Sequence, residues 1–320
     1  MFRRLLVPLD GSARAERAAL TAARIARATG SSILLHRVVE VAARTGPAFE
    51  VPPVMLSQIE HDIVNATEYL ERFAGRPEFT GLAIDKIVLE GGVADTIIET
   101  IADESVDLVV MCSHGQGGVL HLALGSVARG LARHAPVPLL ILRENGSIPG
   151  SDTSAPAHRA LVALDGSAFA ERAIKPAATL LAGLSAGQSA ELMLVRVALQ
   201  ASGPSGTSNG VEAGQYLAAL RERLQQTPAE YPVQVASQVL HGSHVAKTLI
   251  EAAGGGMRDE REPVYDFLAV ATHGRGGLQR LRLGSVTGDI LRDARVPLLI
   301  IPLLTPASDA HGITPATATS

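Results

Sequence analysis

The chain has 320 residues, of which 47% are hydrophobic, 19% are charged and only 3% are aromatic, with no Trp. This composition is that of a globular protein, and the length predicts two domains, each with a core of Leu, Val, Ile and Ala. A formal net charge of −4 argues against nucleic acid or an anionic membrane as a partner.

The single cysteine, Cys112, excludes an internal disulfide and fits a reducing compartment. The first four residues lead directly into a predicted strand, with no apolar signal region. Apolar runs all fall short of the roughly 18 residues that span a bilayer. We therefore expect a soluble, cytoplasmic protein.

Strands and helices alternate along the first half of the chain. Asp10-Gly11-Ser12 forms a turn after the first strand, and Gly30 ends the helix that follows. The alternation predicts an α/β fold with a parallel, doubly wound sheet. The predicted strands are 5–9, 33–39, 84–89, 107–111 and 137–142, and the predicted helices are 13–28, 56–73, 93–103 and 125–134.

The same pattern restarts after a polar segment rich in Gly, Pro and Ser. Leu161 to Ser167 repeats Leu6 to Ser12, with Ala163 in place of Pro8. Several later segments repeat in the same order, which indicates a tandem duplication of one domain. We expect domains at 1–143 and 158–304, a linker at 144–157 and a disordered tail at 305–320. A Gly/Ser/Asn stretch at 202–210 is expected to be mobile.

One short stretch occurs once in each half. The first copy runs from Met111 to Gly115 and, after nine residues, continues as Gly125-Ser126-Val127. The second runs from Val270 to Gly274 and continues as Gly284-Ser285-Val286. A strand, a glycine loop and a helix that opens with Gly-Ser can bind phosphate, because glycines admit an anion and the helix offers unpaired N–H groups.

In an open α/β sheet, ligands bind beyond the carboxyl ends of the strands, where the strand order reverses. Asp10 and the end of the second strand, near Val38, fall at such ends, as do Asp165 and Val197 in the second half. An aspartate can accept a hydrogen bond from a ribose hydroxyl or an adenine amino group. The alternative is that an Asp-Gly-Ser turn serves only as a helix start. By the same reasoning, His114 and His273 are read as structural and Cys112 as an inert core thiol.

The pattern Gly-x2-Gly-x9-Gly-Ser/Thr after a strand, with an early strand that ends in Asp, resembles the universal stress protein family. The resemblance covers both halves and implies two five-stranded parallel domains of the adenine-nucleotide alpha-hydrolase-like type. It implies that ATP binds, with or without Mg2+, and that the protein acts in stress adaptation. The implied nucleotide contacts are Pro8, Asp10, Val38, Met111, Gly115, Gly125, Ser126 and Val127 in the first half, and Asp165, Val197, Val270, Gly274, Gly284, Ser285 and Val286 in the second.

This sequence departs from the family pattern at the first glycine, which is Cys112 in one half and Ala271 in the other. A side chain there could crowd the ligand. The loop 275–283 carries Arg275, Arg280 and Arg282, whereas the loop 116–124 has neither Lys nor Arg. We therefore expect the second half to hold a triphosphate more strongly, with Arg282 as a contact; the alternative is that these arginines face solvent.

Other motifs do not support an enzyme. The sequence has no Gly-x4-Gly-Lys-Ser/Thr, no metal-ligand spacing and no nucleophile–base pair, so we expect no catalytic residues, no metal site and at most slow ATP hydrolysis. Two alternatives stay open: a nucleotide-free interaction module with the same fold, and an enzyme of the wider nucleotide-activating superfamily. The last strand of each half is expected to pair with the other in an intramolecular pseudo-dimer. A homodimer and an unknown protein partner stay open.

Overall fold

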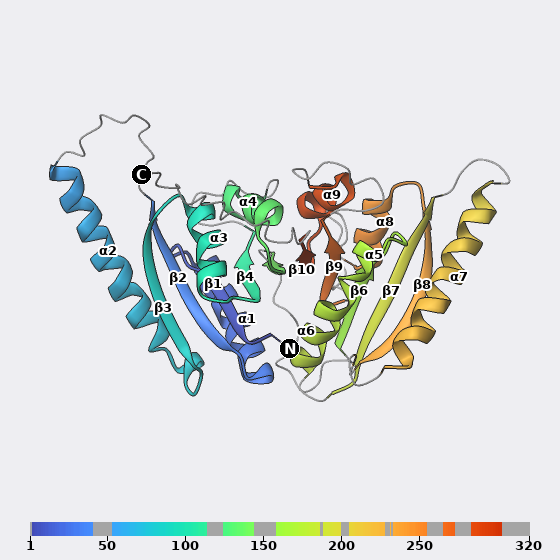
Figure 1. Ribbon diagram of the computed structural model, residues 1–320, viewed down its shortest axis with the longest axis horizontal. Helices are drawn as coiled ribbons and strands as arrows, with labels where there is room; N and C mark the ends of the chain where they lie inside the picture. The colour runs from blue at the N-terminus through green and yellow to red at the C-terminus, as the bar shows by residue number, and fades with distance from the viewer. Residues whose placement is uncertain are drawn as a thin grey trace, which may run out of the picture.

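The computed structural model describes residues 2–40, 53–113, 124–143, 158–185, 188–199, 205–227, 231, 233–254, 265–272 and 283–302. Its ten strands form one continuous sheet in the order β3-β2-β1-β4-β5-β10-β9-β6-β7-β8 (Figure 1). The strands are β1 (Arg4–Pro8), β2 (Ser32–Glu40), β3 (Ile84–Gly91), β4 (Leu108–Cys112), β5 (Leu139–Leu142), β6 (His158–Ala163), β7 (Ala190–Leu199), β8 (Gln234–Gly242), β9 (Phe267–Ala271) and β10 (Leu298–Ile301).

Within each half the strands are parallel, as predicted, and the two halves have the same strand order. The halves meet where β5 pairs with β10 in antiparallel register, with Leu140 opposite Leu299. All residues of both strands are buried. The predicted pairing of the two last strands is therefore confirmed, and two apolar strand edges become the centre of one sheet.

Helices cover both faces of the sheet. In the first half the chain adds β2 and β3 on one side of β1 and then β4 and β5 on the other, and right-handed connections that run in opposite directions lie on opposite faces. One face packs against α1, α2, α6 and α7, and the opposite face packs against α3, α4, α8 and α9. The helices are α1 (Ala13–Thr29), α2 (Pro53–Ala74), α3 (Val93–Asp103), α4 (Ser126–His134), α5 (Ala168–Glu171), α6 (Ile174–Ser185), α7 (Ser205–Gln225), α8 (Val245–Ala252) and α9 (Ser285–Asp293), with a 3-10 turn at Pro77–Phe79.

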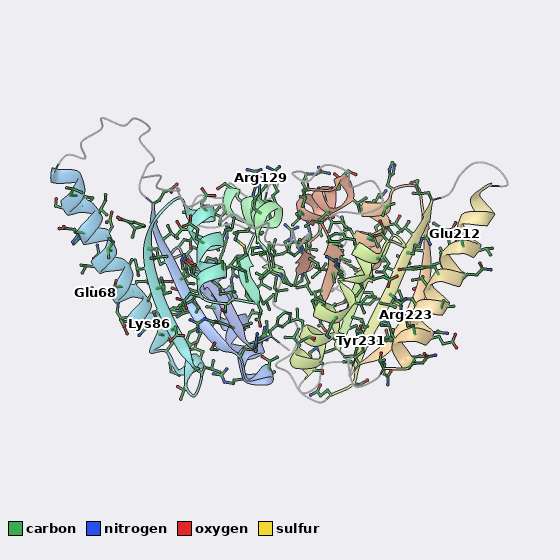
Figure 2. The ribbon with its side chains drawn as sticks, viewed as in Figure 1. Glu68, Lys86, Arg129, Glu212, Arg223 and Tyr231 are labelled. Carbon is green, nitrogen blue, oxygen red and sulfur yellow. The ribbon has the colours of Figure 1, made fainter. Side chains whose placement is uncertain are left out.

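Helices α2 and α7 lie at the two outer ends of the molecule, with the exposed Glu68 on α2 and with Glu212 of α7 paired to Arg196 of β7 at 3.0 Å (Figure 2). The outer strands β3 and β8 end the sheet, and Lys86 of β3 forms an ion pair with Glu71 of α2 at 2.6 Å. Charged side chains on an edge strand disfavour pairing with further strands. No helix in the described part of the chain is both long and apolar enough to cross a membrane.

The two halves differ in their first helix. In the first half it is one helix, α1, whereas in the second half it is interrupted between α5 and α6. Pro176 explains the break, because its ring would clash with the carbonyl of Arg172, four residues earlier. Pro176 is tolerated in the first turn of α6, where its missing N–H has no partner to lose.

Helix α7 begins at Ser205, so the second part of the segment 202–210, which was expected to be mobile, is helical. Glycines let this helix approach the sheet: a Cβ at Gly210 would lie 3.2 Å from Cε1 of His241 on β8. Residues 144–157 and 305–320, the expected linker and tail, lie outside the described residues.

A second contact between the halves joins α1 and α6, which lie near the middle of the molecule (Figure 1). A Cβ added at Gly183 of α6 would lie only 2.6 Å from the Cγ2 methyl of Thr29. Thr29 cannot turn away freely, because its buried hydroxyl donates to the carbonyl of Ile25 at 2.8 Å. Gly183 therefore permits the close approach of the two halves on this face.

Gly183→Ala is expected to lower the free energy of unfolding by about 1–3 kcal/mol, because the clash with Thr29 exceeds the gain in helix propensity. Combination with Thr29→Ser, which removes only the clashing methyl, is expected to recover most of this loss. Denaturant unfolding of the parent, the two single variants and the double variant forms a double-mutant cycle, which gives the coupling energy between positions 183 and 29. Additive losses would contradict a contact between Gly183 and Thr29.

Candidate functional site

The strand order reverses once in each half, at the middle of its own set of strands. In the first half β1 lies between β2 and β4, and in the second half β6 lies between β7 and β9. The connections that leave the carboxyl ends of β1 and β4 pass to opposite faces, so these ends diverge. Such a switch point is where open α/β sheets bind ligands.

The aspartate turns after β1 and β6 have the same geometry. Asp10 Oδ1 accepts the N–H of Ser12 at 2.9 Å, and Asp165 Oδ1 accepts the N–H of Ser167 at 2.9 Å. Gly11, between Asp10 and Ser12, has a φ of 85°, a backbone conformation that favours glycine. Each aspartate thus helps to fix a helix start, and Asp165 Oδ1 also accepts the Ser167 hydroxyl at 2.6 Å.

The serine of each turn caps the helix that follows. Ser12 Oγ accepts the N–H of Ala15 at 3.2 Å, and Ser167 Oγ accepts that of Ala170 at 3.1 Å. The first helix of each half therefore begins with a side-chain cap. The cap satisfies one of the first N–H groups, so this helix start is a poorer anion site than that of α4 or α9.

Helices α4 and α9 begin differently, with glycine at the N-cap. Gly125 and Gly284 have no side chain that could cap the first N–H groups, and neither helix has an acidic residue in its first turn. The N–H groups of Ser126 and Ser285 are thus available to an anion at the positive end of each helix dipole.

The two ends of each glycine loop are held together by the main chain. The N–H of Gly125 donates to the carbonyl of Ser113 at 2.8 Å, and that of Gly284 donates to the carbonyl of Thr272 at 2.8 Å. The N–H of Ser113 donates in turn to Leu142 of β5. Each helix start is therefore held by a main-chain hydrogen bond to the residue that follows the preceding strand, Ser113 after β4 and Thr272 after β9. Gly115, Gly274, Arg282, His114 and His273 lie outside the described residues.

Apolar side chains predicted for the site share one face of the sheet. Val38, Met111 and Val127 all belong to the core cluster on the α3 and α4 side. In the second half, Val197 and Val270 belong to the same cluster. Val286 differs, since it is 37% exposed. Pro8 ends β1 and is partly buried, with Ala163 at the same place in β6.

The residues that replace the first glycine of the family pattern fit the sheet as ordinary strand residues. Cys112 pairs with Leu142, and Ala271 pairs with Ile301. The Cys112 thiol points to the α1 side, away from Met111, and donates to the carbonyl of Arg14 at 2.7 Å. Its side chain therefore does not crowd the face that holds Val38 and Met111.

Burial raises the pKa of Cys112 to about 11, although the nearby Arg17 acts in the opposite direction. The thiol is therefore protonated at neutral pH, and a protonated, partly buried thiol is a weak nucleophile.

The structure adds a residue that the sequence patterns do not single out. His36 of β2 is fully buried, in register with Pro8. Its Nε2 lies 3.0 Å from Thr100 Oγ1, whose own proton goes to the carbonyl of Thr96 at 2.8 Å. The Nε2 must therefore carry the proton and donate to Thr100. Its Nδ1 is buried with no hydrogen-bond partner among the described residues.

Burial lowers the pKa of His36 to about 4, so the ring is neutral at physiological pH. In the second half the corresponding residue is Val195, which pairs with Ala163 as His36 pairs with Pro8. In the sequence, only a comparison of the two halves could have singled out this histidine, because it is polar where the matching residue of the second half is apolar. Among the described residues, no cluster of His, Cys, Asp and Glu could hold a metal ion.

Comparison with known proteins links this fold to one family. A sequence model described as "Universal stress protein family" matches residues 1–143 and again residues 156–302. A universal stress protein of Mycolicibacterium smegmatis is 25% identical over 303 residues, which cover 93% of this chain and 96% of that protein. A universal stress protein of Mycobacterium tuberculosis is 26% identical over 305 residues, which cover 92% of this chain and 96% of that protein.

Solved structures agree in fold. The crystal structure of a universal stress protein from Archaeoglobus fulgidus has a TM-score of 0.65 at 20% identity and covers 93% of this chain and 98% of its own. A protein of unknown function from Pseudomonas aeruginosa has a TM-score of 0.60 at 19% identity and covers 95% of this chain and 93% of its own. The tandem arrangement is thus found in other proteins of similar length.

His36→Val is expected to flatten the acid limb of the stability curve. The unfolded chain protonates this histidine near pH 6.5, whereas the folded chain does so only near pH 4. The unfolded state therefore binds more protons between these values, and the free energy of unfolding falls as the pH drops through this window. The loss is at most about 3 kcal/mol at 1.36 kcal/mol per pKa unit.

Val is the matched replacement because it is what the second half has at Val195, and Thr100 keeps its bond to Thr96. Denaturant unfolding of both proteins at several values between pH 4 and 7 measures the difference. Parallel curves over that range would show that His36 does not titrate as its burial demands.

Proposed function

The chain belongs to the universal stress protein family, and we propose that each of its halves binds an adenine nucleotide at its switch point. The observation that supports this most strongly is the uncapped N-terminus of α4 and of α9, each fixed by a main-chain bond to the strand before it. An anion held there would satisfy N–H groups that no side chain of the N-cap residue can reach.

The residues around each helix start have the chemistry that the parts of a nucleotide require. The Ser126 and Ser285 hydroxyls add donors for phosphate oxygens beside the helix N–H groups. Asp10 and Asp165 stand at the ends of β1 and β6, where a carboxylate would accept from a ribose hydroxyl. Val38 offers main-chain groups and an apolar surface to an adenine ring. Pro8, Met111, Val127, Val197, Val270 and Val286 would complete the contacts.

ATP is the proposed ligand, with or without Mg2+, and Gly115 and Gly274 are proposed to hold its phosphates. We assign Arg282 to the second site as a further phosphate contact, which would favour a triphosphate there. On this proposal 1–143 and 158–304 are two nucleotide-binding domains of one pseudo-dimeric chain. The domains work in the cytoplasm, where a lone thiol stays reduced.

The proposed role is binding, with at most slow ATP hydrolysis. Nucleotide occupancy would set the conformation of the chain or its affinity for a protein partner, and stress adaptation would follow from that. A nucleotide-free interaction module with the same fold is the competing reading. The two make opposite predictions about the ligand content of the purified protein.

The first experiment is to denature the purified protein and to identify and count the released nucleotide by mass spectrometry. About two adenine nucleotides per chain would support binding in both halves, and about one would mean that the halves have diverged. The absence of nucleotide, together with no uptake of added ATP, would overturn the proposal in favour of the interaction module.

Gly125→Asp and Gly284→Asp are expected to abolish the two sites one at a time. Gly125 has a φ of −55°, and Gly284 has a φ of −57°, so Asp fits either position without backbone strain. Asp is also a favoured N-cap residue, so the fold should be kept or stabilised. Its carboxylate would occupy the place of the phosphate and repel it, so we expect no detectable ATP binding in that half.

The matched control is Asn at the same two positions. Asn also caps a helix but has no charge, so the Gly→Asn proteins should lose less affinity than the Gly→Asp proteins. Isothermal titration with ATP measures both. Equal affinity of the Gly, Asn and Asp proteins would place the phosphates elsewhere than at the starts of α4 and α9.

A further inference from the structure

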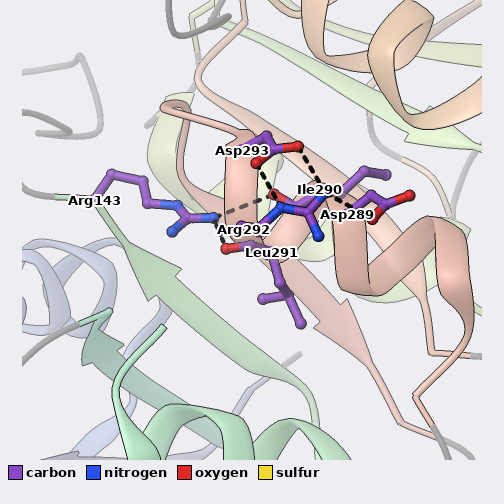
Figure 3. A network of polar contacts seen from close by, with 6 residues as sticks. All are labelled: Arg143, Asp289, Ile290, Leu291, Arg292 and Asp293. Carbon is purple, nitrogen blue, oxygen red and sulfur yellow. Dashed lines mark hydrogen bonds and ion pairs between the residues drawn. The ribbon is translucent and has the colours of Figure 1, made fainter. Parts of the chain in front are cut away.

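One side chain of the first half ends on a helix of the second half. Arg143 follows β5 directly, and its Nη2 donates to the carbonyls of Leu291 at 2.5 Å and Ile290 at 3.2 Å (Figure 3). Both carbonyls belong to the last turn of α9. Ile290 already accepts the N–H of Ala294, whereas the last carbonyls of a helix usually have no intrahelical partner.

The antiparallel pairing of β5 and β10 explains how this contact arises. Ile141 stands opposite Leu298, so the end of β5 lies beside the start of β10. Only a short turn separates that start from the end of α9 at Asp293. Arg143 is therefore brought to the end of α9 by strand pairing, although it is 148 residues away from Leu291 in the chain.

The contact is electrostatically favourable as well as directional. Burial lowers the pKa of Arg143 to about 10 while the Asp293 carboxylate acts in the opposite direction, so the guanidinium stays charged at neutral pH. A cation at the C-terminal end of a helix stabilises the helix dipole. The partly buried position of Arg143 limits screening by solvent.

The other end of α9 is the proposed phosphate-binding end of the second site. It is fixed to β9 by the Gly284 N–H bond to Thr272 and by Thr287 Oγ1, which donates to the carbonyl of Ala271 at 2.8 Å. Helix α9 has nine residues and spans about 13 Å. So short a helix moves as one body, and a shift at its C-terminal end is transmitted to its N-terminus.

The first site keeps the main-chain bond from Gly125 to Ser113 but has no counterpart of the Arg143 and Thr287 attachments at the matching positions. Position 302, which corresponds to Arg143 in the repeat, is Pro and has no side-chain donor. Ala128 corresponds to Thr287 and has no hydroxyl. The pairing of β5 and β10 treats the two halves alike, but the side chains that contact α4 and α9 at these positions differ.

We propose that Arg143 is a positioning residue for the second nucleotide site. It fixes α9 from the first half, so that the N–H groups at Ser285 are held where the phosphates bind. The first half thereby sets the affinity of the second site, and no contact of this kind acts on α4 from position 302. The inference rests on the proposed function, because it concerns the same helix start.

The test measures ATP affinity by isothermal titration in two backgrounds of the full chain. Gly125→Asp leaves only the second site, and Gly284→Asp leaves only the first. Arg143→Gln, which removes the charge, is expected to weaken ATP binding about tenfold in the first background and less than twofold in the second. The first site thus serves as an internal reference for any general loosening of the fold.

Two matched variants separate positioning from stability. Arg292 lies on the exposed side of α9 and pairs only with Asp289 and Asp293 among the described residues, so Arg292→Gln should leave both affinities within twofold. Gly183→Ala weakens the contact between the halves on the other face and should also leave them unchanged. Arg143→Lys keeps the charge and should lose less affinity at the second site than Arg143→Gln.

The outcomes separate the inference from the function on which it rests. No ATP uptake by the parent chain in either half would overturn the proposed function, and the inference with it. Binding at the second site that is unaltered in Arg143→Gln, or equal losses at both sites, would overturn the inference alone. If Arg143→Gln does not fold, Arg143→Lys decides, because a loss confined to the second site supports the inference and no such loss overturns it.

Discussion

The pairing of β5 with β10 is the constraint on which the rest of this structure depends. Each half alone would present a short strand made only of buried apolar residues at the edge of its sheet. An exposed apolar edge invites uncontrolled pairing with other chains. By pairing with each other, the two strands remove this hazard and make one ten-stranded sheet from two duplicated halves. The outer edges that remain lie beside α2 and α7 (Figure 1), and their strands contain polar and charged residues.

That pairing also brings side chains of one half to the other. It places Arg143 at the end of α9, and on the opposite face α1 and α6 approach closely because Gly183 leaves room for Thr29. The halves are thus in contact on both sides of the sheet. These contacts are the physical link through which the proposed effect of Arg143 on the second half would act.

The duplication gives two candidate sites with the same backbone geometry and different side chains. The aspartate turns and the helix starts have the same geometry in both halves. The surroundings differ: His36 faces Thr100 in the first half, where the second has Val195, and Thr287 braces the second helix start, where the first has Ala128. Under the proposed function, these differences would give the two halves unequal affinities for the ligand.

The sequence by itself determined the order of strands and helices, the duplication and the positions of the aspartates and of the glycine-serine helix starts. These features depend on local periodicity, on turn residues and on a pattern that occurs twice in one chain. Such local patterns predict an element whatever the rest of the fold is. The sequence also predicted the central strand pair, because the last strand of each half is apolar and its edge must be covered, and the other half can cover it. The sequence did not predict the break at Pro176, because the repeat suggested the same uninterrupted helix in both halves. It also did not predict the start of α7 at Ser205, which depends on how closely this helix approaches β8.

Only the tertiary structure decided which way the side chains point. Cys112 turns toward α1, on the face of the sheet opposite to Met111, whereas the sequence did not decide whether its side chain would crowd a ligand. The unpartnered Nδ1 of His36 and the reach of Arg143 to Leu291 have no local signal, because each depends on a partner far away in the chain. Sequence patterns report the period of an element, whereas contacts between elements are fixed only when the sheet has formed and its faces are covered.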